Sequence, residues 1–372
     1  MKTARLMVAE SERDANMLYA TRMFVPDPFI WFEVGGKRYA VMSDLEIDRA
    51  CQQAQVDRVL SLSRYQKRLE RSGLKQPRFG DLLKQVLREF RVRRVEVPAN
   101  FPVGLAERLR GIRVAVKHDP FFPEREIKTT REVSMLAGAM RLAEEGMQAA
   151  VSLLRRSRIG RDRFLYWRGR KLRAENVQGI INATIAGRGG VASRTIVAGG
   201  NQGCDPHEVG HGPLRAHATI ILDIFPRDTR TGYCGDITRT VVRGRASDAV
   251  KKLYAVVGRG QEIAFRKLRD GVNGREVHTA IQQLFVSEGY KTGVIRGRRQ
   301  GFFHGTGHGL GLDVHERPRI STASEVLRAG QVVTVEPGLY YWGVGGVRLE
   351  DVVVIRSTGC RNLARFPKVL EI

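Results

Sequence analysis

The sequence predicts an α/β (α+β) protein with two domains, and three observations support this. The chain has 372 residues, which is enough for two domains of ordinary size. Hydrophobic residues make up 42% of it, so a large core can form. Helix and strand patterns alternate along the first third, and short strands separated by glycine turns fill the last third. We therefore expect domains of residues 1–125 and 126–372.

The first domain contains a clear hairpin. Alternating apolar residues predict strands at 29–34 and 37–42, joined by a turn at Gly35-Gly36. Ser43 or Asp44 can cap a helix that begins at Leu45. The remaining predicted elements are a helix at 81–90, strands at 94–98 and 112–116, and a stiff proline-containing linker at 119–123.

The second domain begins with a strong helix signal. Thr129 and Glu132 form a capping box, and an apolar stripe follows at spacings of three and four. Core packing is the favoured interpretation of that stripe, which consists of Val133, Leu136, Met140, Ala143, Met147, Val151 and Leu154. Further along we expect strands at 219–222 and 237–242 and helices at 247–270 and 275–288.

Cysteine usage and hydropathy favour a cytoplasmic protein. The four cysteines, Cys51, Cys204, Cys234 and Cys360, form no C-x-x-C pair, which excludes a zinc ribbon and a disulfide framework. Residues 1–13 alternate apolar and charged side chains, so we expect no signal peptide. No segment has the roughly 18 apolar residues of a spanning helix, so we expect no membrane partner.

The net charge of +24 leaves two interpretations open. A basic run lies between Arg155 and Arg173 and includes Tyr166 and Trp167, whose rings could stack on bases. The run contains no zinc finger, recognition helix or aromatic-rich RNA motif. A solvated basic face is therefore the favoured interpretation, with a nucleic-acid partner as the alternative.

Two aspartates stand at the ends of predicted strands. Asp223 follows the strand at 219–222, and Asp236 precedes the strand at 237–242. If these strands pair as a hairpin, the two carboxylates can meet. Carboxylates that close repel each other, so they need a shared proton or cations. Taken alone, two aspartates near turns are more often structural.

A glycine-rich segment adds imidazoles to these acids. Residues 304–316 contain His304, His308 and His315, with glycines between them that allow the backbone to approach a ligand or metal closely. Imidazole is the commonest neutral metal ligand. The spacing is neither that of a zinc finger nor H-E-x-x-H. The alternative, polar loop histidines, is the weaker interpretation.

Two glutamates complete the candidate site. Glu336 ends the apolar run 332–335, and Glu350 lies inside the strand predicted at 346–354. A glutamate within a buried strand is costly unless it is paired or bound to metal, and the alternative is an edge strand facing solvent. Four carboxylates and one imidazole suit two divalent cations such as Mn, Co, Fe or Zn.

The order of these motifs resembles the pita-bread metallopeptidases. The strings are Asp236-Ile237-Thr238-Arg239-Thr240, His304-Gly305-Thr306-Gly307-His308-Gly309, Glu336-Pro337-Gly338 and Arg348-Leu349-Glu350-Asp351. That family includes methionine aminopeptidase, aminopeptidase P and prolidase, with the metal-free creatinase as a relative. The resemblance covers about residues 127–372. It implies a pita-bread catalytic domain at 126–372, and residues 1–125 resemble the creatinase-type N-terminal domain.

The resemblance also implies a role for each ligand. Asp223 would be a terminal ligand of one metal, Asp236 and Glu350 would bridge both metals, and His308 and Glu336 would complete the second. Glu336 would also act as general base on a water or hydroxide between the metals. Manganese is the favoured metal among the four.

Residues around the metals would bind the substrate. His207 matches a family histidine that contacts the substrate, His315 would donate to the substrate carbonyl, and His304 is expected to line the substrate site. Arg348 resembles an arginine of the proline-specific members, and Thr238 would hydrogen-bond to the ligands. His211 is a rival to His207, and Phe225 replaces a glycine found in many members.

The expected activity is hydrolysis of the bond before proline. The two-domain layout and the string from Leu312 to Glu316 resemble prolidase and aminopeptidase P. The substrate would be an Xaa-Pro dipeptide or a peptide with proline at its second position, and the resemblance implies a homodimer. The alternatives are a creatinase-like amidinohydrolase, which needs no metal, and a basic, non-catalytic relative that binds nucleic acid.

Overall fold

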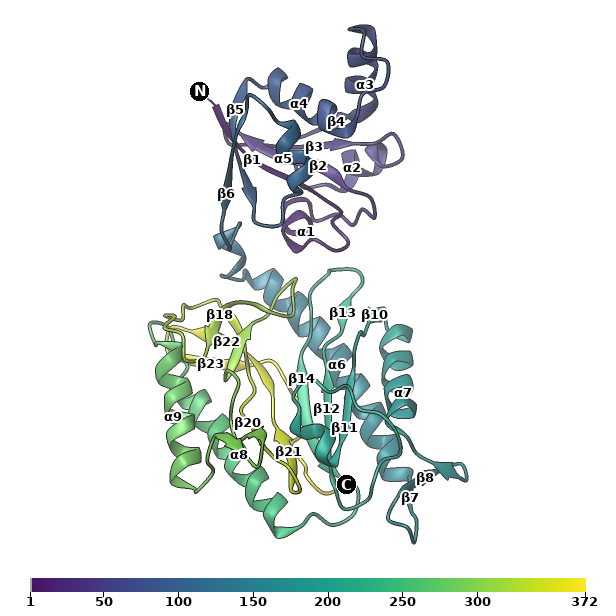
Figure 1. The fold of residues 1–372 in the computed structure, drawn as a ribbon, viewed down its shortest axis with the longest axis vertical. Coiled ribbons are helices and arrows are strands. Elements are labelled where there is room, and N and C mark those ends of the chain that lie inside the picture. Colours follow the sequence, from purple (N-terminus) through teal and green to yellow (C-terminus); the bar gives the residue numbers. More distant parts are fainter. Residues whose placement is uncertain (1) are drawn as a thin grey trace. The chain divides into compact units, whose positions relative to one another are not determined.

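The computed structural model describes residues 2–372, which divide into two compact units between Arg125 and Glu126. Each unit contains its own sheets, helices and buried clusters (Figure 1). Among the described residues, no helix combines the length and the apolar character needed to cross a membrane.

The N-terminal unit is one six-stranded mixed sheet in the order β4-β3-β2-β1-β5-β6. Strand β1 pairs antiparallel with β2 and parallel with β5. The strands are β1 Lys2–Ala9, β2 Phe29–Val34, β3 Lys37–Met42, β4 Arg58–Ser61, β5 Val92–Pro98 and β6 Arg113–Lys117. The helices are α1 Ala15–Thr21, α2 Ile47–Gln53, α3 Leu62–Arg71, α4 Phe79–Glu89 and α5 Val103–Arg108, followed by the 3₁₀ turn η1 Pro123–Arg125.

The hairpin β2–β3 confirms the predicted strands residue for residue, but two other expectations were wrong. Helix α2 begins at Ile47 rather than Leu45, and Glu46 rather than Ser43 or Asp44 occupies its N-cap position. The segment 119–123 is not a bare linker. Phe121 and Phe122 are buried in the core of the N-terminal unit, against residues that include Trp31.

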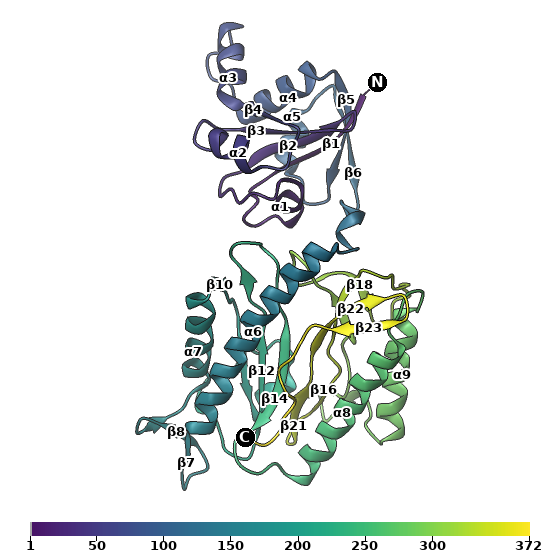
Figure 2. The same cartoon turned by 180° about the vertical axis from the view of Figure 1, so that it is seen from behind.

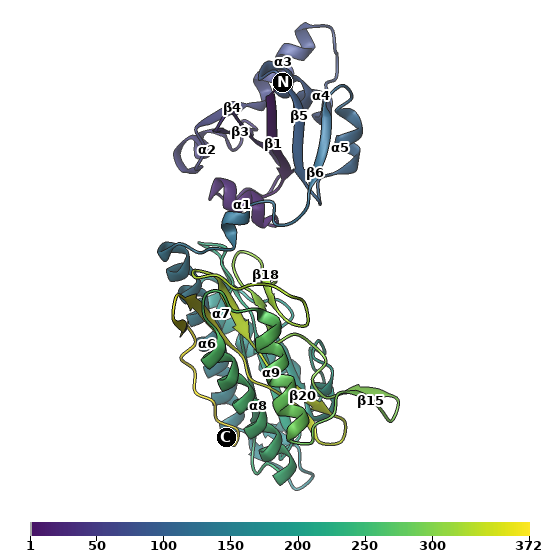
Figure 3. The same cartoon turned by 90° about the vertical axis from the view of Figure 1, so that its left-hand side faces the viewer.

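The C-terminal unit is built from two groups of strands and four long helices. Helices α6 Thr130–Arg156 and α7 Ala174–Gly187 pack on the sheet β11-β12-β14, and α8 Asp248–Lys267 and α9 Gly274–Ser287 pack on strands of the second half. Figure 2 shows α6 and α8 in front of the strands, and Figure 3 shows α6, α8 and α9 from the side. The strands are therefore covered by helices on one face.

The two main sheets of this unit are antiparallel. The first contains β11 Ile196–Gly199, β12 Thr219–Ile224 and β14 Ile237–Val242, and the second has the order β18-β17-β19-β22-β23. The second consists of β17 Gly307–Gly309, β18 Glu316–Ile320, β19 Val332–Val335, β22 Asp351–Arg356 and β23 Gly359–Asn362. Smaller pieces are β7 Arg158–Ile159, β8 Leu165–Trp167, β9 Arg170–Lys171, β10 Gly190–Val191, η2 Gly200–Cys204, β13 Arg227–Asp228, β15 Gly293–Ile295, β16 Arg298–Gln300, β20 Gly338–Tyr341 and β21 Gly345–Arg348.

Helix α6 confirms the predicted cap and stripe. Thr129 Oγ1 accepts from the Glu132 backbone N–H, and the Glu132 carboxylate accepts from the Thr129 backbone N–H. All seven stripe residues are buried. One of them also reaches the acidic cluster described below, because the sulfur of Met140 accepts the backbone N–H of Asp236 at 3.3 Å.

Candidate metal centre

The first pair of candidate ligands comes from the antiparallel pair β12–β14. Asp223 lies within β12, opposite Thr238 of β14, and Asp236 immediately precedes β14. The predicted hairpin-like pairing is therefore present, although β12 extends to Ile224 rather than ending at Leu222. Both carboxylates lie at the same end of the strand pair and both are buried.

The second pair comes from an equivalent arrangement in the other sheet. Strands β19 and β22 are antiparallel, with Val335 opposite Asp351, so Glu336 follows one strand where Glu350 precedes the other. The expectation that Glu350 lies inside a continuous strand was wrong. The run divides into β21 and β22, which belong to different sheets, and the Glu350 backbone N–H instead donates to the carbonyl of Thr238 at 3.1 Å. This hydrogen bond joins the two halves at the site.

His308 is supplied by β17, in the same sheet as β19. Its Nδ1 lies 3.1 Å from the carbonyl oxygen of Gly309, a contact that would hold the proton on Nδ1 if Nε2 bound a cation. The Nε2 atom lies 3.3 Å from Glu336 Oε1 and 3.9 Å from Asp236 Oδ2. An imidazole oriented in this way by a backbone carbonyl is typical of a metal ligand.

Three of the five predicted ligands form a compact donor group. One ligand atom from each of Asp236, His308 and Glu350 lies within 4.8 Å of the others, and all three residues are buried. Asp223 and Glu336 adjoin this group. Asp223 Oδ2 accepts from Arg348 at 2.6 Å, whereas its Oδ1 is buried without a hydrogen-bond partner. A buried carboxylate oxygen without a partner is costly unless a cation or a water satisfies it.

The acids repel one another strongly enough to change their proton affinities. Burial raises the pKa of Asp236 well above its usual range, and the charges of Glu350, Asp223 and Glu336 raise it further. Burial and the charges of Glu336 and Asp223 likewise raise the pKa of Glu350. Glu336 differs, because burial is outweighed by the hydrogen bond and charge of His308, which hold its pKa at about 2. The cluster therefore needs positive charge to be fully ionised.

These features fit a site for divalent cations. Hard carboxylate oxygens combined with one imidazole suit Mn, Fe, Co or Zn. The unpartnered Asp223 Oδ1 and the mutual repulsion of Asp236 and Glu350 would both be relieved by bound cations. This chain therefore has the residues that a divalent-metal centre requires.

Hydroxyl and guanidinium groups hold the acids in place. Thr238 Oγ1 donates to Glu350 Oε2 at 2.6 Å. Arg348 is buried, and its guanidinium contacts Asp223, the hydroxyl of Tyr340 at 3.0 Å and Thr238 Oγ1 at 3.4 Å. These contacts make Arg348 an orienting partner of Asp223, and its contact with substrate remains a prediction.

The other predicted histidines lie around this cluster. His304 is half-buried, and its Nε2 lies 2.8 Å from the hydroxyl of Tyr340. The exposed His315 packs edge-on against His308, with ring centroids 4.3 Å apart. His207 is exposed and follows Pro206, whose carbonyl oxygen lies 3.5 Å from Arg348 Nη2.

The rival histidine faces a different environment. His211 is exposed and contacts Glu208 at 3.4 Å, and its backbone N–H donates to Gln202. Burial lowers the pKa of His304, and the charge of Glu336 opposes this effect. The residue before His207 thus lies beside Arg348, whereas His211 contacts Glu208, and the role of His207 stays a prediction.

Two residues at the site were missed by sequence reasoning. Thr334 Oγ1 accepts the His308 backbone N–H at 3.0 Å and lies 3.3 Å from Glu336 Oε1. It is the single polar residue of β19, a signal that could have identified it. Tyr340 connects His304 to Arg348, and its spacing of four from Glu336 places it on the same side of an extended chain.

The glycines of residues 304–311 have a role other than the one expected. A Cβ at Gly307 would overlap the carbonyl oxygen of Thr334, and one at Gly309 would overlap that of Arg317. These glycines allow β17 to approach neighbouring backbone, and a close approach to a ligand or metal stays a prediction. They place His308 indirectly, by allowing its strand to pack.

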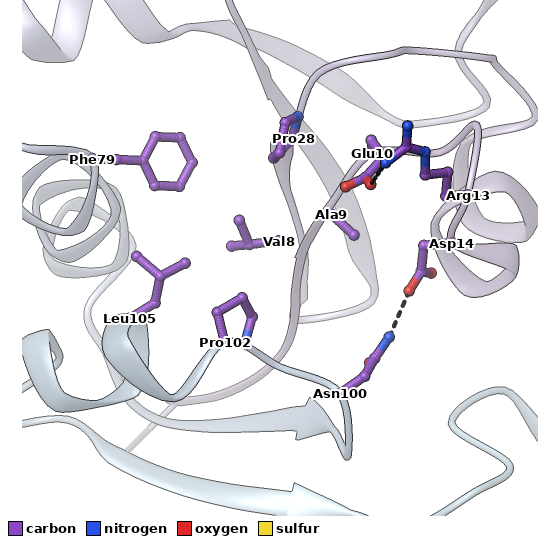
Figure 4. A pocket seen from close by; sticks show the side chains of 10 residues that line it. All are labelled: Val8, Ala9, Glu10, Arg13, Asp14, Pro28, Phe79, Asn100, Pro102 and Leu105. Carbon is purple, nitrogen blue, oxygen red and sulfur yellow. Dashed lines mark hydrogen bonds and ion pairs between the residues drawn. The ribbon is translucent and has the colours of Figure 1, made fainter.

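A cavity of about 600 Å³ lies in the N-terminal unit (Figure 4). It adjoins the ends of β1 and β5, and its walls are mostly apolar side chains such as Phe79 and Leu105. Its polar groups largely satisfy one another, since Asn100 donates to Asp14 at 2.9 Å and Arg13 lies 3.8 Å from Glu10. None of the predicted site residues lines it. The donor group in residues 126–372 is therefore the candidate active site.

The geometry agrees with a comparison against known families. Residues 134–357 match the model of metallopeptidase family M24, which is more than half of the chain. The chain belongs to this family. Family M24 uses divalent metals, and the donor group of Asp236, His308 and Glu350 lies within the matched segment. The predicted family membership is confirmed.

Individual members of family M24 show how far the likeness extends. An uncharacterized peptidase of Bacillus subtilis, YqhT, is 39% identical over 178 residues, which is 48% of each chain. An Xaa-Pro dipeptidase of Pyrococcus horikoshii is 28% identical over 285 residues, which is 75% of each chain. The match with YqhT thus spans about half the length of that relative.

Solved structures extend the likeness to the whole fold. An Xaa-Pro dipeptidase from Bacillus anthracis aligns with a TM-score of 0.83 at 23% identity, covering 99% of this chain and 95% of that one. An X-Pro aminopeptidase from Thermotoga maritima aligns with a TM-score of 0.80 at 23% identity, covering 100% and 97%. The predicted fold class, an N-terminal α/β domain followed by a pita-bread domain, is confirmed.

Proposed function

We propose that this chain is an exopeptidase that uses two divalent cations to hydrolyse the peptide bond before proline. The observation that carries the proposal is the buried donor group of Asp236, His308 and Glu350, with Asp223 and Glu336 beside it. We assign Asp223 as a terminal ligand, Asp236 and Glu350 as bridging ligands, and His308 and Glu336 as the remaining ligands. A creatinase-like amidinohydrolase would need none of these ligands, so the complete set argues against that alternative.

Bound divalent cations would supply an acidified water and would stabilise negative charge on the scissile carbonyl. The chain's own groups account for the remaining chemistry. The Glu336 carboxylate is ionised at neutral pH, because its pKa is held at about 2 by His308 despite burial. We assign it to accept a proton during attack and to return it to the leaving amine.

Neighbouring side chains would orient the peptide. His315 packs against His308 and can donate to the substrate carbonyl, while His207 and His304 can contact the substrate on the Arg348 side. Arg348 would act mainly by orienting Asp223 through their 2.6 Å contact. Relatives named as Xaa-Pro dipeptidase and X-Pro aminopeptidase support proline at the second position of the substrate.

Metal content tests the ligand assignment. Metal analysis of the purified protein should show up to two divalent ions per chain, and Asp236→Ala and His308→Ala should each lose metal. His211→Ala is the matched control, because His211 contacts Glu208 and none of the five assigned ligands. This variant should keep the wild-type metal content. Unchanged metal content in Asp236→Ala and His308→Ala would refute the assignment.

Two substrate series assayed side by side test the specificity. Hydrolysis of Xaa-Pro dipeptides alone would identify a dipeptidase, and hydrolysis of longer X-Pro-Y peptides would identify an aminopeptidase. A metal-loaded protein that cleaves neither series would refute the proposed substrate class.

We further propose manganese as the native metal, a homodimer and a cytoplasmic location. Metal analysis, light scattering and cell fractionation test these in turn.

A further inference from the structure

A small sheet in the C-terminal unit concentrates positive charge. Strands β7, β8 and β9 form a three-stranded antiparallel sheet that follows the end of α6, and we call residues 155–173 the basic sheet. These residues include nine arginines and lysines but only one acid, Asp162. Their net charge of +8 is one third of the +24 of the whole chain. Figures 1 and 2 show β7 and β8 projecting from the rest of the unit.

Most of this charge is uncompensated. All nine basic side chains are exposed. Lys171 pairs with Asp162 at 2.9 Å, and Arg173 pairs with Glu175 at 3.1 Å. The other seven form no ion pair with any carboxylate of residues 2–372. Concentrated, unpaired guanidinium groups attract polyanions, and they bind phosphate oxygens in bidentate geometry.

One face of the basic sheet also carries aromatic rings. Arg158 lies opposite Tyr166, and Tyr166 lies opposite Lys171, so these three side chains share a face. Phe164 belongs to the same face, because Lys171 Nζ lies 4.1 Å from its ring centroid. Arg215, from a neighbouring loop, lies 4.5 Å from the Phe164 centroid, and Arg158 lies 5.2 Å from that of Tyr166. Two half-buried rings are thus surrounded by cations.

We propose that this face of the basic sheet binds single-stranded nucleic acid, independently of the peptidase function. Arginines would contact the phosphates, and the rings of Phe164 and Tyr166 would stack on bases, a combination typical of surfaces that bind single strands. A bilayer fits less well, because none of the large exposed apolar side chains lies between residues 155 and 173. The sign of the charge alone favoured a solvated face, and the contacts between cations and rings add structural evidence for a binding surface.

The salt dependence of binding tests the phosphate contacts. Fluorescence anisotropy with labelled 12-nucleotide oligouridylate and oligothymidylate should show binding at low salt that weakens steeply as salt rises. The triple variant Arg158→Ser, Arg161→Ser, Arg215→Ser should reduce the slope of log Kd against log salt by about 2, since each lost phosphate contact removes about 0.7. Its metal content and melting temperature should match the wild type, which shows that the fold is kept.

A charge-matched variant distinguishes a site from a general effect of net charge. The triple variant Arg91→Ser, Arg93→Ser, Arg110→Ser removes three exposed arginines from the N-terminal unit and changes the net charge equally. It should bind the oligonucleotides as the wild type does. Equal weakening by both triple variants, or no oligonucleotide binding at low salt, would overturn the proposal.

The aromatic contribution needs its own variants. Tyr166→Ala should weaken oligonucleotide binding at least about fivefold, because stacking on one base contributes at least that much. Tyr166→Phe keeps the ring and loses only the 2.9 Å hydrogen bond to Asp162, so it should bind normally. Anionic phosphatidylserine vesicles are the competing probe. Tight vesicle binding combined with oligonucleotide binding that is insensitive to Tyr166→Ala would overturn the proposal in favour of a membrane surface.

Discussion

The behaviour of the candidate site follows from three buried acids that influence one another. Glu350 raises the proton affinity of Asp236, and the charge of Asp223 raises the proton affinity of both. Arg348 offsets part of this charge through Asp223, and Thr238 contributes a hydrogen bond to Glu350. Single residues therefore determine whether the site holds protons or cations.

Above the ordinary pKa range of a carboxyl group, the metal-free protein should lose stability as pH rises. The folded pKa values of Asp236 and Glu350 lie above their ordinary values of 3.8 and 4.5. Their protonated forms therefore stabilise the fold fully below those ordinary values, and this stability is lost as pH rises through the raised values. Glu336 acts in the opposite sense, but its contribution is lost only as pH falls towards about 2.

The variant Asp236→Asn tests this account. Asparagine keeps the shape but removes one of the repelling charges, so in chelator its melting temperature should fall less with rising pH than that of the wild type. Excess divalent cation should raise the wild-type melting temperature and leave that of Asp236→Asn nearly unchanged. Thermal melts from pH 5 to 8 provide the measurement. The same dependence of melting temperature on pH in both proteins, measured in chelator, would contradict this account of Asp236.

At the scale of elements, the ends of two antiparallel strand pairs bring the acids together. Strands β12 and β14 deliver Asp223 and Asp236, and β19 and β22 deliver Glu336 and Glu350 at an equivalent position. Strand β17 can join this arrangement only because Gly307 and Gly309 have no side chain. The sequence signals for strands were correct here, but the run 346–354 gave no sign of the division between β21 and β22.

Substituting Gly307 should damage both the fold and the site. A Cβ in Gly307→Ala would overlap the Thr334 carbonyl, so β17 must move and carry His308 with it. We expect a loss of about 1–3 kcal/mol in the free energy of unfolding, together with weaker metal binding. Gly179→Ala is the matched control, since Gly179 lies in helix α7 with open space around it, and it should be neutral or stabilising by up to about 1 kcal/mol. Denaturant titration measures both effects, and equal stability of the two variants would be inconsistent with this role.

At the scale of the whole molecule, all five candidate ligands belong to residues 126–372. The two buried clusters of the N-terminal unit contain residues of that unit alone, and the cluster around α8 and α9 contains residues of the C-terminal unit alone. Metal binding should therefore stabilise the C-terminal unit selectively.

Hydrogen exchange with mass spectrometry can measure this selectivity. Removing metal with a chelator should speed exchange in peptides that cover β12, β14, β19 and β22, because these strands carry or adjoin the ligands. Peptides that cover β1, β2 and β3 of the N-terminal unit should exchange at an unchanged rate. An equal response in both sets would show that the units are coupled through the metal centre.

The sequence by itself determined the family, the fold class, the hairpin β2–β3, the cap and buried stripe of α6, and the acids and histidine that the structure gathers into one cluster. These features are local or ordered along the chain, so periodicity and motif order reveal them. Only the tertiary structure decided that Gly307 and Gly309 serve backbone packing and that Thr334 and Tyr340 belong to the site. The physical reason is that these roles depend on contacts between strands far apart in sequence, whose distances and burial no single segment encodes.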